Sequence, residues 1–179
     1  FGATIRDIEN QTLLVRRERY KHAPPDASGL SDFEFVIELY EEPLRLIEHV
    51  VMNDRPYSEI VTLAGTVGSK RHPSMWKGVE DSFDPAGDEW QIFAYTDGRP
   101  AAGVLATGAW NTRWASNPAN AQRYRAAAAA RALICKDYFA GDVQLGSVDL
   151  TDEDAIDNAI LTEPACVSCH QTMDPLAGF

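Results

Sequence analysis

Two cysteines and a histidine form a compact group near the carboxyl end of the chain. Cys166 and Cys169 have two residues between them, and His170 follows directly in the stretch "ACVSCHQTMDPLAGF". We call Cys166–His170 the Cys-x-x-Cys-His motif. Three kinds of chemistry use such a group: covalent attachment of haem c, a zinc site, and a redox-active dithiol.

Haem c attachment requires two thiols that reach the two vinyl groups on one edge of the porphyrin, and an imidazole that turns under the iron. The motif supplies all three on one helical turn, which is why this spacing indicates a haem-attachment site. The chain holds three cysteines and four histidines in 179 residues. At that content, chance would produce the motif in roughly one shuffled chain in a thousand, so we favour haem c.

A zinc site is the main alternative, because Cys135 together with Cys166, Cys169 and His170 would make a Cys₃His ligand set. Cys169 and His170 are adjacent in the sequence, however, and adjacent residues bind one tetrahedral ion only with awkward geometry. A thioredoxin-type dithiol would open a helix directly after a β-strand. The motif instead follows a predicted helix, so the dithiol is the least favoured of the three.

Capping signals and apolar residues at helical spacing predict a mainly α fold. Ser31 and Glu34 fit a capping box that opens a helix, and Pro43 is expected to begin a second one. Residues 1–30, charged at first and then rich in Pro, Gly and Ser, are expected to form an N-terminal arm. We therefore expect a helical domain over residues 31–179.

A long alanine-rich helix and the helix of the motif are predicted further along the chain. Asn117 is expected to cap the first of these and Gly141 to end it, with Cys135 buried as an inert thiol on its apolar side. Thr162 is expected to cap the helix that carries the motif. Asp174 is expected to cap the other end of that helix, without a chemical role.

Turns dominate the middle of the chain. The stretch from Gly65 to about Asp88 is predicted to be a long loop, and ordered loops of that length are usually functional or supported by something bound. Residues 89–108 are a candidate β-hairpin that turns at Asp97-Gly98. The predicted fold is thus mainly α, with a long central loop and a small β-hairpin.

The charge of the chain limits its partners. Acidic residues outnumber basic ones, 27 to 16, and the formal net charge is -11. Nucleic-acid binding requires a basic surface, so no such partner is expected, whereas basic proteins suit an acidic surface. No apolar run reaches the roughly 18 residues that span a bilayer, so no transmembrane segment is expected. The sequence opens at Phe1 without a methionine, which suggests a processed chain or a portion of a longer protein.

The carboxyl-terminal segment resembles the haem-binding segment of the planctomycete-type cytochrome c families. In "CVSCHQTMDPLAGF" the motif is followed by an Asp-Pro-Leu element and a Gly-Phe pair, which is typical of these families. The stretches "LRLIEHVVMNDRPYSEIVT" and "GRPAAGVLATGAWNTRWAS" are similar to other segments of the same proteins, so the resemblance covers pieces of residues 35–179. It implies that Cys166 and Cys169 carry the two haem thioethers and that His170 is the proximal iron ligand. Family members often continue for tens of residues past the Gly-Phe pair, where this sequence stops.

The motif and the resemblance together predict a cytochrome-c-like helical haem domain, a c-type cytochrome that transfers one electron at a time. Haem c is attached outside the cytoplasm, so we expect a periplasmic or extracytoplasmic membrane-surface location, within a larger assembly of redox proteins. A haem-dependent, peroxidase-like enzyme with an open sixth position is one alternative. A zinc-stabilised structural or interaction domain that uses Cys135, Cys166, Cys169 and His170 is the other.

The second axial ligand of the iron is expected to come from upstream of the motif, from another chain, or to be absent, because only residues 171–179 follow His170. Met173 lies on the same helix, cannot cross to the opposite face of the haem, and is expected to pack. We prefer Met75 as the distal ligand and His72 as the second candidate, because both lie in the predicted long loop beside an aromatic residue. The remaining candidates are Met52, His49 and His22.

Overall fold

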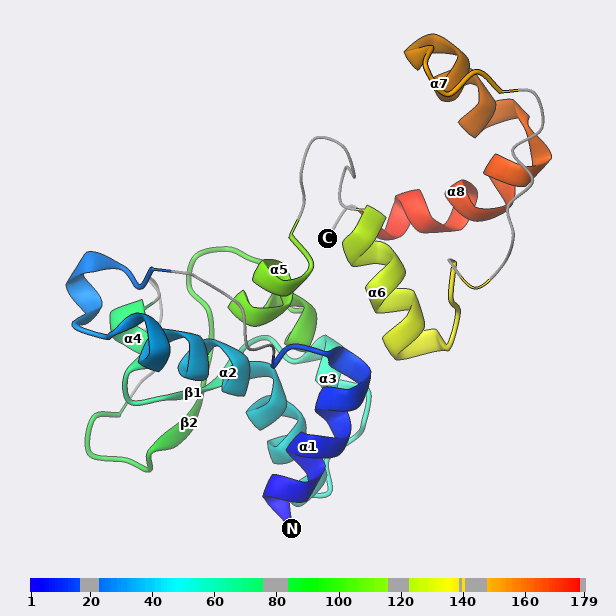
Figure 1. Cartoon of the computed structure of the whole chain (residues 1–179). Helices are drawn as coiled ribbons and strands as arrows, with labels where there is room; N and C mark the ends of the chain where they lie inside the picture. The colour runs from blue at the N-terminus through cyan, green and yellow to red at the C-terminus, as the bar shows by residue number, and fades with distance from the viewer. Residues whose placement is uncertain (17–22, 76–83, 116–122, 139, 141–147, 178–179) are drawn as a thin grey trace. The chain divides into compact units, whose positions relative to one another are not determined.

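The structure is a computed structural model that describes residues 1–16, 23–75, 84–115, 123–138, 140 and 148–177 (Figure 1). Within these ranges the chain forms eight α-helices and one two-stranded antiparallel sheet, which confirms the mainly α fold. The chain divides into two compact units, Phe1–Arg113 and Trp114–Phe179. None of the helices in the described ranges is long and apolar enough to cross a membrane.

One long helix, α2 (Asp32–Met52), is the centre of the first unit. It opens with the predicted capping box: the Ser31 hydroxyl accepts the backbone N–H of Glu34, and the Glu34 carboxylate accepts the backbone N–H of Ser31. Pro43 lies inside this helix and does not begin a second one, so that prediction is wrong. Its missing N–H removes one helical hydrogen bond, but buried apolar residues on both sides of it hold the helix against its neighbours. These residues are Leu39, Leu44, Leu46, Ile47 and Val50.

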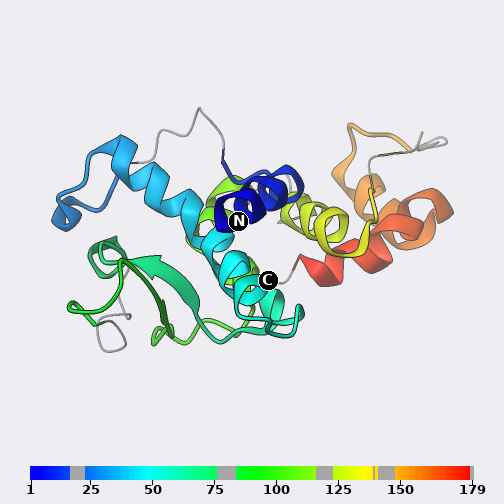
Figure 2. The same ribbon diagram turned by 90° about the horizontal axis from the view of Figure 1, so that it is seen from below.

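The first residues of the chain form a helix that packs along α2 (Figure 2). This helix, α1, spans Gly2–Leu13. Arg6 of α1 pairs with Glu41 of α2 at 3.1 Å and also with Glu48 further along the same helix. Because these contacts join α1 to α2, the first helix is part of the first unit.

A small sheet forms in the middle of the first unit, but its two strands are not those of the predicted hairpin. β1 (Thr66–Ser69) lies inside the predicted loop and pairs antiparallel with β2 (Trp90–Phe93). Every residue of β1 is buried, so its backbone groups need ladder partners, and β2 provides them. The chain does turn at Gly98, whose φ is +81°, but Pro100 after the turn has no N–H to donate to a ladder. The shorter elements of this unit are η1 (Asp26–Ser28), α3 (Glu59–Thr62), α4 (His72–Met75), η3 (Gly103–Ala106) and α5 (Gly108–Arg113).

A buried carboxylate joins several of these elements. Glu42 of α2 is fully buried and accepts hydrogen bonds from the Tyr95 hydroxyl and, at 3.1 Å, from the backbone N–H of Gly108. The Nε2 atom of His72 lies 3.6 Å from the same carboxylate. Burial raises the pKa of Glu42 to about 7, and burial together with the charge of Arg99 lowers the pKa of His72 to about 3. The histidine is therefore neutral at physiological pH, and its contact with Glu42 is not an ion pair.

The helices described in the second unit are α6 (Arg123–Ile134), α7 (Glu153–Thr162) and α8 (Pro164–Leu176). α8 packs against both of the others. α6 ends at Ile134 instead of Gly141, because Cys135 leaves the right-handed helical conformation, with a φ of 56°. Cys135 is exposed as a result, so the prediction of a buried thiol is wrong. Asn117, the predicted cap of this helix, lies outside the described residues.

Replacing Glu42 with glutamine should change the pH dependence of stability. Because the pKa of Glu42 is raised, its contribution to stability is present below its ordinary value of 4.5 and is lost as the pH rises through about 7. His72 acts in the opposite sense, because its lowered pKa contributes stability that is lost as the pH falls below 6.5. Relative to the parent, the Glu42→Gln chain should therefore gain on the order of 3 kcal/mol in free energy of unfolding between about pH 4.5 and pH 8.

Urea unfolding followed by circular dichroism at a series of pH values measures this difference. Glu89→Gln removes the same group at an exposed position of the first unit and supplies the baseline profile. A Glu42→Gln profile that runs parallel to this baseline would contradict the raised pKa of the buried carboxyl group.

Candidate haem-attachment site

The Cys-x-x-Cys-His motif lies on α8, which confirms that it is helical. The helix begins at Pro164, whose missing N–H is harmless in the first turn, and Glu163 is its N-cap. Thr162, the predicted cap, is instead the last residue of α7. The two cysteines and the histidine have the spacing i, i+3 and i+4, so they share one face of the helix.

The three side chains of the motif are accessible. Cys166, Cys169 and His170 are each partly exposed, and both cysteines are free thiols. Two free thiols and an imidazole on one helical face match what covalent haem c requires. The residues present therefore fit this group.

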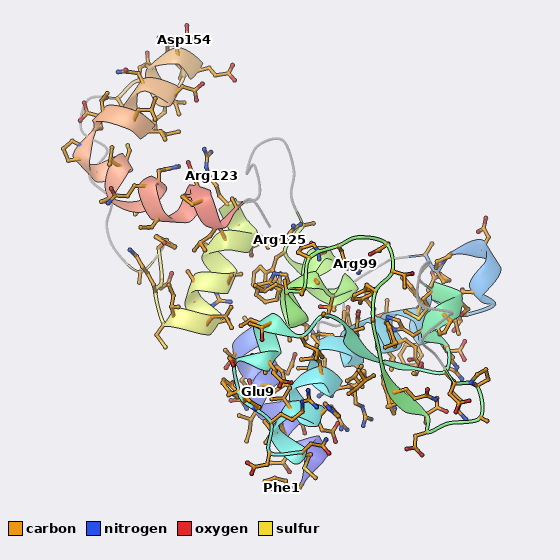
Figure 3. All side chains as sticks on the ribbon, turned by 180° about the vertical axis from the view of Figure 1, so that it is seen from behind. Phe1, Glu9, Arg99, Arg123, Arg125 and Asp154 are labelled. Carbon is orange, nitrogen blue, oxygen red and sulfur yellow. The ribbon has the colours of Figure 1, made fainter. Side chains whose placement is uncertain are left out.

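The imidazole of His170 has a partner on one of its two nitrogens. Its Nδ1 atom lies 3.2 and 3.1 Å from the two carboxylate oxygens of Asp174, one turn further along α8. Arg123 of α6 donates to the same carboxylate, from Nε to Oδ1 at 2.9 Å and from Nη2 to Oδ2 at 3.3 Å. Figure 3 labels Arg123 where α6 meets α8. One carboxylate thus joins the motif to a second helix.

The charge of Asp174 decides where the proton of His170 resides. Partial burial by itself would raise the pKa of Asp174, but the hydrogen bonds from Arg123 and His170 outweigh it and hold that pKa below its usual range. An ionised carboxylate can only accept hydrogen bonds, so Nδ1 is the donor. In the neutral ring the lone pair is then on Nε2, the nitrogen that remains for a metal.

The sequence did not reveal this role of Asp174. α8 continues through Pro175 to Leu176, so Asp174 does not end the helix as expected. Its spacing of four residues from His170 was the available signal, because side chains at i and i+4 are neighbours on a helix. Nothing comparable in the sequence pointed to Arg123.

α8 packs on a face of α6 that consists of alanines, whose small side chains allow the two helices to approach closely. Met173 of α8 is 7% exposed and lies in this interface, so the prediction that it packs is confirmed. The hydroxyl groups of Tyr138 and Thr172 share a hydrogen bond of 2.8 Å. Cys169 packs at the edge of the cluster, which ties the motif to the interface. The buried members are Ala126, Ala127, Ala130, Tyr138 and Met173.

The two preferred distal ligands lie in the first unit. Met75 is 4% exposed and His72 is fully buried, both in α4. The ring of His72 packs against Phe93, with 4.6 Å between the ring centroids, and faces Glu42. Burial in the core of the first unit explains both residues without iron, and their role as ligands stays a prediction. Of the remaining candidates, His22 lies outside the described residues.

The alternative zinc set is not assembled. Cys135 is exposed beyond the end of α6, whereas the other three residues of the set lie on α8. In the part of the chain that the structure describes, no group of three or more His, Cys, Asp and Glu side chains is placed to hold a metal ion.

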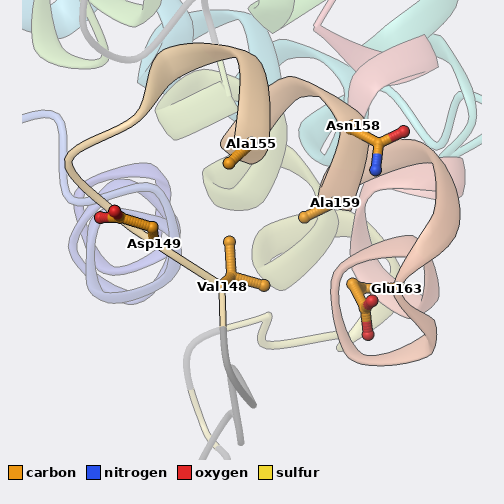
Figure 4. A pocket seen from close by; sticks show the side chains of 6 residues that line it. All are labelled: Val148, Asp149, Ala155, Asn158, Ala159 and Glu163. Atoms are coloured by element: carbon orange, nitrogen blue, oxygen red, sulfur yellow. The ribbon is translucent and has the colours of Figure 1, made fainter.

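A pocket of about 270 Å³ lies beside the start of α8 (Figure 4). Glu163, the N-cap of α8, and Asp149 contribute carboxylates to its lining. The carboxylate of Asp149 is already engaged, since it accepts hydrogen bonds from the backbone N–H and the hydroxyl of Thr151. The pocket borders the helix of the motif and not the motif itself. Its lining residues are Val148, Asp149, Ala155, Asn158, Ala159 and Glu163.

Comparison with known proteins returned no match: no family model, no curated protein and no solved structure is similar enough to the chain. The resemblance of the carboxyl-terminal segment to planctomycete-type cytochromes stays a prediction. The interpretation of the site therefore rests on its residues and their geometry.

Truncating Met173 to alanine should weaken the contact between α6 and α8. Removing a buried methionine side chain from a packed cluster destabilises a protein by roughly 2–5 kcal/mol, because the cavity left behind collapses only in part. Met52→Ala is the matched control, since Met52 is 51% exposed and its truncation should change stability by less than about 0.5 kcal/mol. Urea unfolding measures both, and equal effects would refute the packing described for α8.

Proposed function

We propose that the protein is a c-type cytochrome, a cytochrome-c-like helical domain that transfers single electrons through one covalently bound haem c. The observation that carries this proposal is the motif itself. Two free thiols and an imidazole share one face of α8, and Nδ1 of the imidazole is already hydrogen-bonded. Haem c is the group that uses two thiols and the remaining imidazole nitrogen together.

Cys166 and Cys169 would hold the haem through two thioether bonds. In each bond the sulfur joins a vinyl carbon and the thiol hydrogen passes to the adjacent carbon, so the attachment needs no oxidant. His170 would bind the iron through Nε2 while Nδ1 stays hydrogen-bonded to Asp174. When bound, the haem supplies an iron couple that exchanges one electron between its ferrous and ferric forms.

The acidic charge of the chain suits a positively charged redox partner. The chain carries a net charge of -11, and the first turn of α7, which packs on α8, contains Glu153 and Asp154. Complementary charge speeds the encounter of a basic partner with such a surface. Because haem c is attached outside the cytoplasm, we place the protein in the periplasm or on an extracytoplasmic membrane surface, within an electron-transfer assembly.

A haem enzyme with an open sixth position, such as a peroxidase, is the second candidate. The sequence of the second unit contains one histidine, His170, and one methionine, Met173. Met173 is buried against α6, and the upstream candidates Met75 and His72 are buried in the first unit. These placements favour an iron whose sixth position is left for water or a substrate.

Covalent haem should depend on the two motif cysteines and not on Cys135. Expression with a haem c maturation system in a bacterial periplasm should yield a chain whose reduced α-band survives denaturation. Combining Cys166→Ala with Cys169→Ala should abolish the covalent haem, whereas Cys135→Ala, the matched control, should retain it. A colourless parent chain that carries zinc would instead support the zinc-stabilised domain.

Whether a side chain occupies the sixth coordination position of the iron distinguishes the electron carrier from the enzyme. In the carrier, Met75→Ala should remove the far-red charge-transfer band of the oxidised protein, because the iron loses its thioether ligand. Cyanide should then bind the variant faster than the parent. If neither Met75→Ala nor His72→Ala changes the spectrum, and cyanide binds the parent at once, the open-site enzyme is the better description.

A further inference from the structure

The contact between His170 and Asp174 differs from an ordinary pair on a helix surface. Two side chains four residues apart on an exposed helix face interact only weakly. Here a side chain from another helix joins them, since Arg123 of α6 donates from two nitrogens to the two oxygens of Asp174. The side chains of His170, Asp174 and Arg123 are 21%, 34% and 33% exposed. The fork of the guanidinium therefore fixes the orientation of a partly buried carboxylate.

We propose that Asp174, held by Arg123, is a positioning residue that keeps the proton of His170 on Nδ1 and sets how strongly Nε2 donates to the haem iron. This inference rests on the proposed function. The carboxylate accepts a hydrogen bond from the Nδ1–H group, which leaves the lone pair on Nε2 and raises the basicity of that nitrogen. Arg123 limits the effect, because its positive charge partly neutralises the carboxylate.

Removing Asp174 and removing Arg123 should have opposite effects on the reduction potential of the iron. Without the carboxylate, His170 donates less, the ferric form loses stabilisation, and the reduction potential rises. Without Arg123, the carboxylate keeps its full charge beside His170, the ferric form gains stabilisation, and the potential falls. If the contact between Asp174 and Arg123 were merely structural, removing either residue would shift the reduction potential in the same direction, because either change breaks the same link between α6 and α8.

The first test is a redox titration of the full chain with haem attached, followed by visible absorption. At a fixed ambient potential, Asp174→Asn should raise the ratio of reduced to oxidised haem roughly tenfold, about 59 mV for one electron. Arg123→Gln should lower this ratio severalfold, and Arg123→Lys, which keeps the charge, should return it towards the parent value.

Two control variants remove the same charges elsewhere in the second unit. Asp157→Asn changes an exposed position of α7, and Arg131→Gln changes an arginine of α6 whose guanidinium lies over the Trp114 ring. Screening by solvent and salt should keep the ratio of reduced to oxidised haem in both controls within about twofold of the parent value. Shifts in the Asp174 and Arg123 variants that do not exceed those of the controls overturn the inference.

The second test needs no haem. In the haem-free chain at about pH 8, nitrogen NMR shifts of His170 should report a proton on Nδ1. Asp174→Asn should move the proton population towards Nε2, with an unchanged circular dichroism spectrum. This readout tests Asp174 even in a chain that never takes up haem, so failure of the proposed function and failure of the inference are distinguishable.

Two further outcomes overturn the inference. One is a parent chain in which His170 carries its proton on Nε2. The other is a pair of variants, Asp174→Asn and Arg123→Gln, that shift the potential in the same direction. A chain that attaches haem and gives either result retains the proposed function and loses the role of Asp174.

Discussion

The packing of α8 on α6 is the interaction on which the candidate site depends. Alanines on α6 let the two helices approach closely, Met173 fills the interface, and Arg123 reaches Asp174 across it. The ionised Asp174 in turn determines which nitrogen of His170 carries the proton. Burial of apolar side chains positions α6 against α8. This position allows Arg123 to bind Asp174, and Asp174 in turn to bind Nδ1 of His170.

Two carboxyl groups of this chain show how environment changes one chemical group. Glu42 is fully buried, and hydrogen bonds from Tyr95 and Gly108 do not offset the loss of water, so its pKa rises. Asp174 is only partly buried and accepts hydrogen bonds from Arg123, so its pKa falls. The first stabilises the interior of its unit as a neutral acid below about pH 7. The second, as a fixed anion, orients the side chain proposed to bind iron.

The division of the chain bears on the second axial ligand of the iron. His170 belongs to the second unit, whereas Met75 and His72 are core residues of the first. A buried side chain that left its packing to bind the iron would lose the free energy of that burial. An iron whose sixth position stays open avoids this cost. That is the physical basis of the enzyme alternative.

Features confined to one helical turn could be predicted from the sequence, because their geometry is local. The capping box of Ser31 and Glu34 and the helix under the motif are of this kind. The predictions of a second helix that begins at Pro43 and of a hairpin within residues 89–108 were wrong. Burial of apolar faces and strand pairing between distant segments overrode the local signals. The sequence by itself determined that two thiols and an imidazole share one helical face. Only the tertiary structure decided that Asp174 has Arg123 as its partner, because these residues are 51 positions apart and meet when α8 packs on α6.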